Sequence, residues 1–242
     1  MNRSTLILGD AIEEMAKIDD CSIDLILVDL PYGVTNNKWD VIIPFDKMWE
    51  QFNRIKKVRT PIILTATQPF ASMLIMSNLK MFKYDLIWEK TISSGQLNVK
   101  HQPLRNHESV LVFYDKIPTY NEQKTEGKPY NIKRSGNYSE NNYNCQKSSS
   151  KNNDGYRHAK SVIKISNPRI KNGHPTQKPI ELLDYIIRCY SNENDTVLDC
   201  CMGSGSTGVS ALKNNRIFLG IEKEQNYFEI AKKNIEDEYS RT

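Results

Sequence analysis

The sequence has little of what membrane, secreted or metal-binding proteins require. Its 242 residues contain no apolar run near the length of about 18 residues that a membrane helix needs, and the N-terminal segment meets acids too soon for a signal peptide. The five cysteines are odd in number and lack CxxC spacing, which argues against a disulfide framework and a zinc site. We therefore expect a cytoplasmic protein that does not contact a membrane.

Two common catalytic patterns are also missing. The four histidines share no metal-ligand spacing, and no serine lies in a G-x-S-x-G turn, so we expect neither a metal site nor a Ser-His-Asp hydrolase. No internal repeat is present. The length suits one α/β domain with a small insertion and is too short for two domains of ordinary size.

The basic residues are concentrated in one segment. The formal net charge of the chain is +4, but residues 131–171 alone hold nine basic residues against two acids and leave a small negative balance for the rest. A basic segment on a mildly acidic body is typical of a contact with a polyanion. The segment is also rich in Asn, Ser, Gly and Tyr, as solvated loops are, so both interpretations stay open.

Short apolar stretches alternate with helical patterns along most of the chain, which predicts an α/β fold. The strand-like stretches are nearly continuous apolar runs, as in parallel sheets that are covered on both faces. Between 84 and 114 two strands follow each other without a helix, so an antiparallel pair is expected at one sheet edge. Residues 119–171 show no periodicity and predict an inserted lobe. Strands are expected at 4–9, 23–29, 61–67, 84–89, 109–114, 196–200 and 217–222, and helices at 46–58, 69–80, 179–190, 206–214 and 224–238.

A glycine-rich turn follows the predicted strand 196–200. Residues 203–208 have the pattern G-x-G-x-x-G and lead into a predicted helix, and Glu222 ends the next strand. This context is typical of nucleotide-cofactor sites, in which an acid after the second strand binds ribose hydroxyls. Asp199, placed before the turn, favours a cationic ligand such as a sulfonium compound with an ammonium group over a pyrophosphate. A tight turn without a ligand is the alternative.

A second motif, D-L-P-Y-G at residues 29–33, ends the predicted strand 23–29. In open α/β sheets, ligands bind beyond the carboxyl ends of the strands. An acid, a backbone carbonyl in a proline-stiffened turn and an aromatic ring suit a planar base that carries an amino group. In an arbitrary protein, D-x-P-Y alone would be better explained as a loop with a capping Asp and a packed Tyr.

Together these motifs resemble the amino-group DNA methyltransferases, which use S-adenosylmethionine and carry a D/N/S-P-P-Y motif and a glycine-rich cofactor loop. D-L-P-Y-G precedes an insertion, H-P-T-Q-K-P at 174–179 and the glycine loop, an order that matches the permuted beta class. Leu8–Ala11 resembles the adenine-side cofactor motif, and Trp88–Lys90 and 107–108 resemble later motifs. The phage and prophage adenine methylases look the most similar, because they share motifs of the kind of G-V-T-N-N-K-W-D at 33–40 and M-G-S-G-S-T-G at 202–208.

The resemblance implies a Rossmann-like, seven-stranded, mostly parallel sheet of the S-adenosylmethionine-dependent methyltransferase type, permuted and with an antiparallel edge strand. Residues 1–118 and 172–242 would form the catalytic domain, the second part binding the cofactor, and residues 119–171 would form the target recognition region. The strand that ends in D-L-P-Y-G would lie beside the strand that precedes the glycine loop.

By resemblance, the site would methylate the exocyclic N6 of an adenine that is flipped out of duplex DNA. The Asp29 carboxylate and the Leu30 carbonyl would accept hydrogen bonds from the amino group. Pro31 would hold the turn, and Tyr32 would stack on the base. Leu30 stands where the family usually has proline, and Cys200–Cys201 stands where Pro-Phe is common.

The resemblance also implies binding residues. Asp10 would face the adenine amino group of the cofactor, and Lys178 would approach its methionine carboxylate together with Thr176, which could equally be a helix cap. Contacts to DNA phosphates or bases are expected from the inserted region. The residues implied for the cofactor are Asp10, Ala11, Asp29, Thr176, Lys178, Asp199, Gly203, Gly205, Ser206 and Glu222, and those for DNA are Arg134, Arg157 and Lys160.

Three alternatives stay open at this point. Cytosine-N4 methylation is the nearest, although Asp at position 29 favours adenine because Ser is more usual in the N4 group. A nicotinamide-dependent oxidoreductase would use the glycine loop but leaves D-L-P-Y and the basic segment unexplained, and an inactive DNA-binding regulator would keep the fold without turnover. Beside double-stranded DNA, the resemblance names a second copy of the chain and a cognate restriction endonuclease as partners, as in restriction-modification systems.

Overall fold

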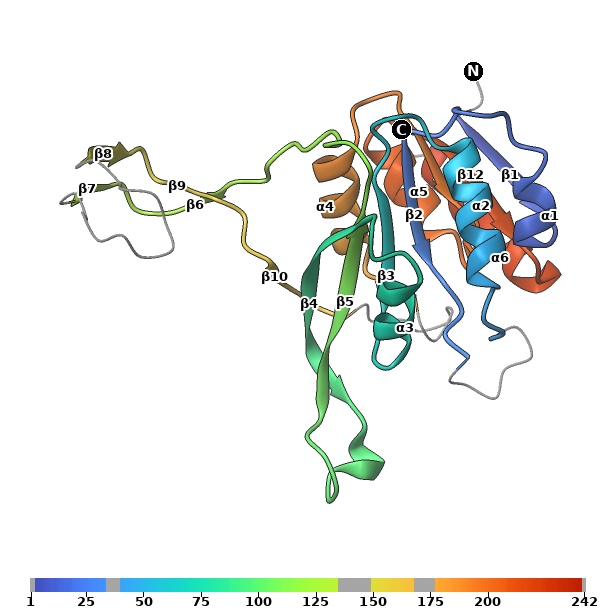
Figure 1. The fold of residues 1–242 in the computed structure, drawn as a ribbon, viewed down its shortest axis with the longest axis horizontal. Helices are drawn as coiled ribbons and strands as arrows, with labels where there is room; N and C mark the ends of the chain where they lie inside the picture. The colour runs from blue at the N-terminus through green and yellow to red at the C-terminus, as the bar shows by residue number, and fades with distance from the viewer. Residues whose placement is uncertain (1–2, 34–39, 135–148, 168–176, 241–242) are drawn as a thin grey trace. The chain divides into compact units, whose positions relative to one another are not determined.

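The computed structural model describes residues 3–33, 40–134, 149–167 and 177–240 (Figure 1). The chain divides into two compact units. Met1–Asn121 with Ser161–Thr242 form the larger unit, here called the body, and Glu122–Lys160 form the smaller one, here called the lobe. The chain thus re-enters the body at Ser161, whereas the sequence predicts an insertion that continues to residue 171.

An eight-stranded sheet lies at the centre of the body. Its central strands show no polar alternation, because apolar side chains are buried on both faces. All neighbouring strands are parallel except β5, which is antiparallel to both β3 and β4. In spatial order the strands are β1 (Ser4–Leu8), β12 (Ile217–Glu222), β11 (Thr196–Asp199), β2 (Leu25–Asp29), β3 (Ile62–Ala66), β5 (Arg105–Phe113), β4 (Phe82–Ser94) and β10 (Val162–Ile165).

Helices cover both faces of the sheet, and the alternation within β2 shows the two layers. Ile26 and Val28 pack into one apolar cluster with residues of α1, α2 and α3, while Leu25 and Leu27 pack into the other with residues of α4, α5 and α6. The helices are α1 (Ala11–Met15), α2 (Phe45–Ile55), α3 (Phe70–Ser77), α4 (Ile180–Tyr190), α5 (Ser206–Lys213) and α6 (Gln225–Tyr239). No helix in the described part of the chain is long and apolar enough to cross a membrane.

The predicted α/β fold with a mostly parallel sheet is confirmed, with differences at one edge. The antiparallel strand β5 lies inside the sheet and not at its edge, because β4 and β10 follow it. The eighth strand, β10, is not predicted: its residues Val-Ile-Lys-Ile lie in the polar segment assigned to the insertion and, as an edge strand, lack a continuous buried run. The five-residue helix α1 is also not predicted; it begins at Ala11 and is capped by Asp10, whose Oδ1 accepts the N–H of Ile12 at 3.0 Å.

The lobe consists of two short antiparallel strand pairs. β6 (Thr125–Glu126) pairs with β9 (Tyr156–Arg157), and β7 (Tyr130–Arg134) pairs with β8 (Ser149–Asn153). None of the described residues of the lobe belongs to either apolar core cluster.

The order of the strands brings two acidic strand ends together. β2 ends at Asp29, β11 ends at Asp199, and the two strands are parallel neighbours, as the family resemblance implies. β12 adds Glu222 at the end of the next parallel strand. Because carboxyl ends of parallel strands meet at one edge, these three acids face the region where α/β proteins bind ligands.

Candidate functional site

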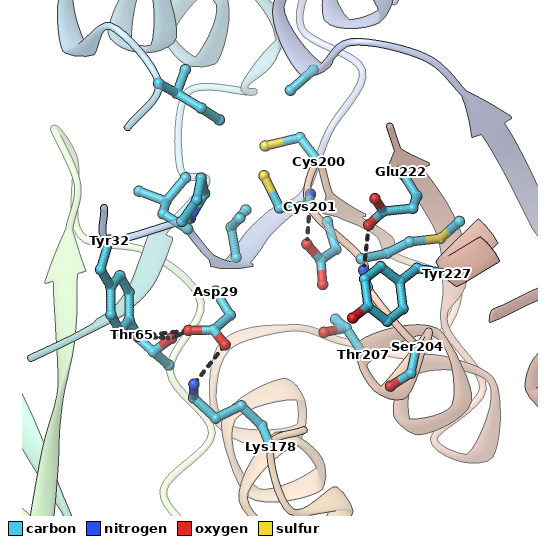
Figure 2. Close-up of a pocket in the computed structure, with 18 of the residues that line it drawn as sticks. Asp29, Tyr32, Thr65, Lys178, Cys200, Cys201, Ser204, Thr207, Glu222 and Tyr227 are labelled. Atoms are coloured by element: carbon cyan, nitrogen blue, oxygen red, sulfur yellow. Dashed lines mark hydrogen bonds and ion pairs between the residues drawn. The ribbon is translucent and has the colours of Figure 1, made fainter. Parts of the chain in front are cut away.

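A cavity of about 540 Å³ lies at this carboxyl edge of the body. Its lining joins residues that are far apart in the sequence and falls into two groups (Figure 2). One group surrounds Asp29, and the other surrounds the glycine loop and Glu222. The cavity has the size and mixed polar and apolar lining of a small-molecule site.

Asp199 is the buried acid of the glycine-loop group. Its residue is 2% exposed, its Oδ1 accepts the N–H of Cys201 at 3.1 Å, and the Thr207 side chain donates a second hydrogen bond. Burial raises the pKa of Asp199 to about 7 against the lowering effect of these bonds, and nearby Asp29 and Glu222 add to the rise. A cation in the cavity would therefore favour the ionised form of this carboxyl group.

Glu222 is held in place by the backbone of the turns beside it. Its Oε2 accepts the N–H of Gly203, and its Oε1 accepts the N–H of Glu224, each at 2.8 Å. Burial raises the pKa of Glu222, and the backbone hydrogen bonds oppose the rise. The carboxylate is thus fixed at the cavity wall, where it can accept hydrogen bonds from ligand hydroxyls.

The other residues predicted for the cofactor are placed as follows. Asp10 lines the cavity, caps α1 and lies 3.5 Å from Nζ of Lys223. Ala11, Gly203 and Ser206 also line it, and Gly205 does not. Thr176 lies outside the described residues, and only 177–179 of the predicted H-P-T-Q-K-P motif are described.

Gly205 has a packing role. It adopts φ +80°, which favours glycine, and a Cβ there would lie 3.0 Å from Cα of Ala231 in α6. We expect Gly205→Ala to lower the free energy of unfolding by about 1–3 kcal/mol, measured by urea unfolding followed by circular dichroism. Gly203→Ala is the matched control, because its φ is also positive at +53° but nothing lies within 4 Å of its Cβ. Equal losses in both variants would contradict the packing role.

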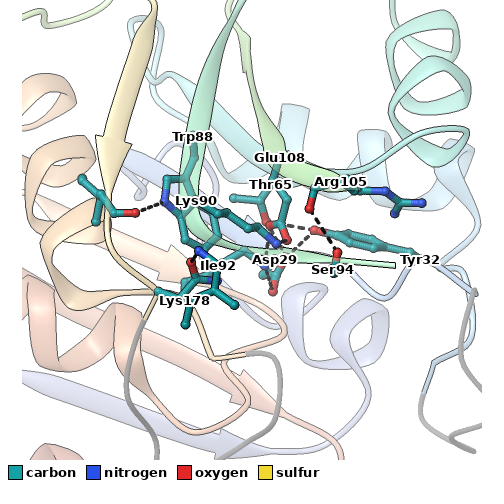
Figure 3. A network of polar contacts seen from close by, with 12 residues as sticks. Asp29, Tyr32, Thr65, Trp88, Lys90, Ile92, Ser94, Arg105, Glu108 and Lys178 are labelled. Atoms are coloured by element: carbon teal, nitrogen blue, oxygen red, sulfur yellow. Dashed lines mark hydrogen bonds and ion pairs between the residues drawn. The ribbon is translucent and has the colours of Figure 1, made fainter. Parts of the chain in front are cut away.

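Asp29 is held by one side chain of its own turn and by two from distant parts of the chain (Figure 3). Its Oδ1 accepts hydrogen bonds from the hydroxyls of Tyr32, at 2.6 Å, and Thr65. Its Oδ2 accepts a hydrogen bond from Nζ of Lys178 at 2.6 Å. The carboxylate is therefore oriented before any ligand arrives, and its side chain remains 31% exposed.

Lys178 connects Asp29 to a second acid, Glu108. Its side chain is 8% exposed, and its Nζ lies 3.3 Å from Oε2 of Glu108, whose Oε1 pairs with Lys90. Burial alone would lower the pKa of Lys178, but Asp29, Tyr32 and Glu108 raise it above its ordinary value. Two cations and two carboxylates thus alternate along one wall of the cavity. The family resemblance implies that Lys178 approaches the cofactor carboxylate, whereas in the structure its Nζ contacts Asp29.

The rest of the D-L-P-Y turn also lines the cavity beside Asp29. Leu30 is buried in the core, and Pro31 lines the cavity. The ring of Tyr32 packs against Phe70 with centroids 5.1 Å apart. Burial and the neighbouring Asp29 raise the pKa of Tyr32 well above its ordinary value, so its hydroxyl remains a hydrogen-bond donor.

Sequence reasoning missed the role of Thr65 and assigned none to Lys90 and Glu108. Lys90 and Glu108 lie within stretches that resemble family motifs, but their chemical role emerges only from the pairing of β4 with β5. Thr65 belongs to no motif. The only signal for it is its place at the end of β3, directly opposite Asp29 in the register.

The three residues predicted to contact DNA belong to the lobe. Nη1 of Arg157 donates to Oδ1 of Asn153 at 2.5 Å, and its guanidinium lies 4.5 Å from the ring centroid of Tyr130, so this side chain stabilises the lobe itself. Lys160 is exposed. Arg134 ends β7, and its side chain lies outside the described residues. A DNA contact by any of them stays a prediction.

The known proteins that resemble this chain in sequence are DNA methyltransferases. The sequence profile described as DNA methylase matches residues 23–233. The chain is 31% identical over 254 residues to the DNA adenine methyltransferase YhdJ of Escherichia coli K12, covering 96% of this chain and 82% of that protein. It is 28% identical over 267 residues to the type II methyltransferase M2.DpnII of Streptococcus pneumoniae, covering 98% and 91%. A shorter match, 43% identical over 75 residues, spans 22% of the type II methyltransferase M.BglI of Bacillus subtilis.

Solved structures show the same fold. The PvuII DNA methyltransferase, described as cytosine-N4-specific, superposes with a TM-score of 0.68 at 15% identity, covering 98% of this chain and 92% of that one. A complex of M1.HpyAVI with SAM superposes with a TM-score of 0.65 at 22% identity, covering 96% and 98%.

Proposed function

Because the chain belongs to the DNA methylase family that groups N6-adenine with N4-cytosine enzymes, we propose that it transfers a methyl group from S-adenosylmethionine to the exocyclic N6 of adenine in duplex DNA. The observation that carries this proposal is the Asp29 carboxylate, oriented by Tyr32, Thr65 and Lys178 at the wall of the cavity. It lies on the strand next to Asp199, so the acceptor base and the cofactor would occupy one continuous cavity.

The donor set of the cavity fits S-adenosylmethionine. Asp199 offers a buried carboxylate to the ammonium group, and Glu222 offers two fixed oxygens to the ribose hydroxyls. Asp10 lines the region assigned to the adenine ring. S-adenosylmethionine supplies an electrophilic methyl carbon bound to a positively charged sulfur.

Asp29 and the Leu30 carbonyl act on the nucleophile. The amino nitrogen of adenine is conjugated with the ring, so acceptors that hold its hydrogens localise its lone pair and stabilise the positive charge that develops on it. The nitrogen forms a bond to the methyl carbon while the carbon–sulfur bond breaks and leaves its electron pair on sulfur. The methylated nitrogen then loses one proton to solvent. Alignment of nitrogen and methyl carbon in one cavity adds the benefit of proximity.

Cytosine N4 is the nearest alternative to adenine N6 as the target of methylation. The similar proteins include an adenine methyltransferase, and the similar folds include a cytosine-N4 enzyme. Asp29 supports adenine, since the resemblance associates serine at this position with the N4 group. Nucleoside analysis of DNA labelled with methyl groups from S-adenosylmethionine tests this: N6-methyladenine is expected, N4-methylcytosine would correct the base, and no labelled nucleoside would refute the proposal.

The partners and the two alternative functions are supported to different degrees. Duplex DNA is the proposed substrate, while a homodimer and a cognate restriction endonuclease stay predictions. Membership of a methylase family replaces the nicotinamide-dependent oxidoreductase as an explanation of the glycine loop. An inactive regulator would keep the fold, so turnover in the labelling experiment separates it from the enzyme.

The raised pKa of Asp199 predicts how cofactor binding depends on pH. In the free protein this carboxyl group carries a proton below about pH 7, and the ammonium group of the ligand favours the ionised form, so binding below this pH requires proton release. We expect the affinity for S-adenosylmethionine to rise up to about tenfold per pH unit between pH 5 and 7 and then to level off. Isothermal titration calorimetry in buffers of different ionisation enthalpy measures both affinity and proton release.

The Asp199→Asn variant is the control for this prediction. It removes this titrating group but keeps the shape of the side chain, so we expect weak binding that depends much less on pH across the same range. A wild-type affinity that is constant from pH 5 to 7 would contradict a role for Asp199 in holding the cationic ligand.

A further inference from the structure

Strands β4 and β5 continue past the edge of the sheet where the cavity opens. The register places Leu86 of β4 at the level of Asp29, through Thr65 of β3 and Val110 of β5. β4 continues to Ser94 with a register shift between Glu89 and Ser94, and its partner β5 begins at Arg105, five residues before Val110. At about 3.3 Å per residue, these five residues of β5 carry the pair well beyond the carboxyl edge of β2. Figure 1 shows the two strands extending together past the ends of their neighbours.

The extended part, residues 91–106, is here called the arm. β10 pairs with β4 only as far as Lys90, and β3 pairs with β5 only from Ser109 onward, so among the described strands none lies beside the arm. Its turn contains Gly95 at φ +94° and the short 3₁₀ helix η1 (Gln96–Asn98). Every residue of the arm from 94 to 106 is exposed.

The side chains of the arm combine exposed apolar groups with positive charge. Leu97 at the tip is 99% exposed, and Ile92 and Val99 are 61% and 57% exposed. The arm contains Lys100 and Arg105 and no Asp or Glu. An exposed apolar tip with only positive charges around it marks an interaction surface, and the charge selects an anionic partner.

The root of the arm belongs to the wall of the proposed active site. Lys90 directly precedes the arm on β4, Glu108 follows it closely on β5, and both belong to the polar network around Asp29 (Figure 3). A base that reaches Asp29 therefore brings its parent duplex to the side of the arm. Extrusion of that base leaves a gap in the stack, which apolar side chains fill in other DNA-bending and base-flipping proteins.

On the basis of the proposed function, we propose that the arm contacts the DNA duplex beside the target base. Leu97 lies against the bases next to the extruded one, and Lys100 and Arg105 contact phosphates. The partner is duplex DNA, and the arm serves binding and base extrusion without touching the reacting atoms.

The test compares two leucines near opposite ends of β4. Leu97→Ala alters the tip of the arm, and Leu79→Ala is the matched control, because Leu79 is 60% exposed and precedes β4 at the opposite edge of the sheet. Methyl transfer from labelled S-adenosylmethionine to plasmid DNA from a methylation-free host gives kcat/KM for DNA. We expect Leu97→Ala to lower kcat/KM at least about tenfold without changing the affinity for S-adenosylmethionine, and Leu79→Ala to match the wild type.

The charged residues are tested by binding alone. Fluorescence anisotropy of a labelled duplex, titrated at several salt concentrations, is expected to show that Lys100→Ala/Arg105→Ala lowers the slope of log affinity against log salt by about 2. This readout does not need turnover, so it separates the two proposals. A wild type that binds DNA through the arm but transfers no methyl group would support the arm and refute the proposed function.

Two results would overturn the arm proposal while leaving the methylation proposal intact. The first is DNA binding and methyl transfer by both arm variants at wild-type levels. The second is a change in self-association, seen by sedimentation velocity, with no change in DNA binding, because the arm would then be a contact between copies of the chain.

Discussion

Replacement of Asp29 by alanine is expected to slow methyl transfer to DNA by about 100- to 1,000-fold, because it removes a preoriented acceptor for the amino group whose nitrogen becomes positively charged. The effect should appear in kcat, since the contact to nitrogen strengthens as the charge develops. Affinity for S-adenosylmethionine should change little, because Asp199 and Glu222 form the other group of the cavity lining. Labelled methyl incorporation and calorimetric titration of the cofactor measure the two quantities separately.

Two further variants make this result specific. Asp29→Asn keeps an acceptor oxygen, and the family motif includes Asn at this position, so we expect it to retain more activity than Asp29→Ala. Asp115→Ala removes an acid that pairs with Lys56 at the surface and should leave kcat unchanged. If Asp29→Ala methylates DNA at the wild-type rate, the proposed catalytic role is wrong.

Replacement of Lys178 by methionine is expected to lower both stability and turnover. Lys178 is buried between Asp29 and Glu108, so its removal leaves two carboxylates without their shared cation, at a cost of about 3 kcal/mol in the free energy of unfolding. Because the pKa of Lys178 lies above its ordinary value, its stabilising charge is fully present at neutral pH. Urea unfolding at pH 7 measures the loss.

A double variant isolates the cause. Lys178→Met/Glu108→Gln removes the cation together with one of its two carboxylates, so part of the lost stability should return, and the difference between single and double variants gives the coupling. Equal stability of wild type and Lys178→Met would contradict the role of this ion pair.

Lys178→Met and the conservative variant Lys178→Arg decide between the two interpretations of Lys178. If Lys178 binds the methionine carboxylate, as the resemblance implies, Lys178→Met should mainly weaken the affinity for S-adenosylmethionine. If it positions Asp29, as the contact at 2.6 Å indicates, kcat should fall while that affinity stays close to the wild type, and Lys178→Arg should restore part of kcat.

Most of the fold could be predicted, because the signals involved are local. The seven strands predicted from apolar runs are all present. The signal is strongest for the central strands β2 and β3, because a strand buried on both faces requires consecutive apolar residues. β10 is not predicted because it is an edge strand. Val162 is 53% exposed, so β10 does not need a continuous run of apolar residues. The antiparallel pair β5–β4 lies inside the sheet because β10 pairs with the outer side of β4, and this could not be foreseen without β10.

The sequence by itself determined the chemical groups of the site and the turns that present them. D-L-P-Y-G and the glycine loop are continuous segments, so their residue types and order are visible without a structure. Only the tertiary structure decided which groups meet. Thr65 reaches Asp29 from the next strand because of the sheet register. Lys178 lies just before α4 and reaches Asp29 across 149 residues of sequence because α4 packs against the sheet. Such contacts leave no pattern in the nearby sequence, because they depend on how distant segments pack in the whole body.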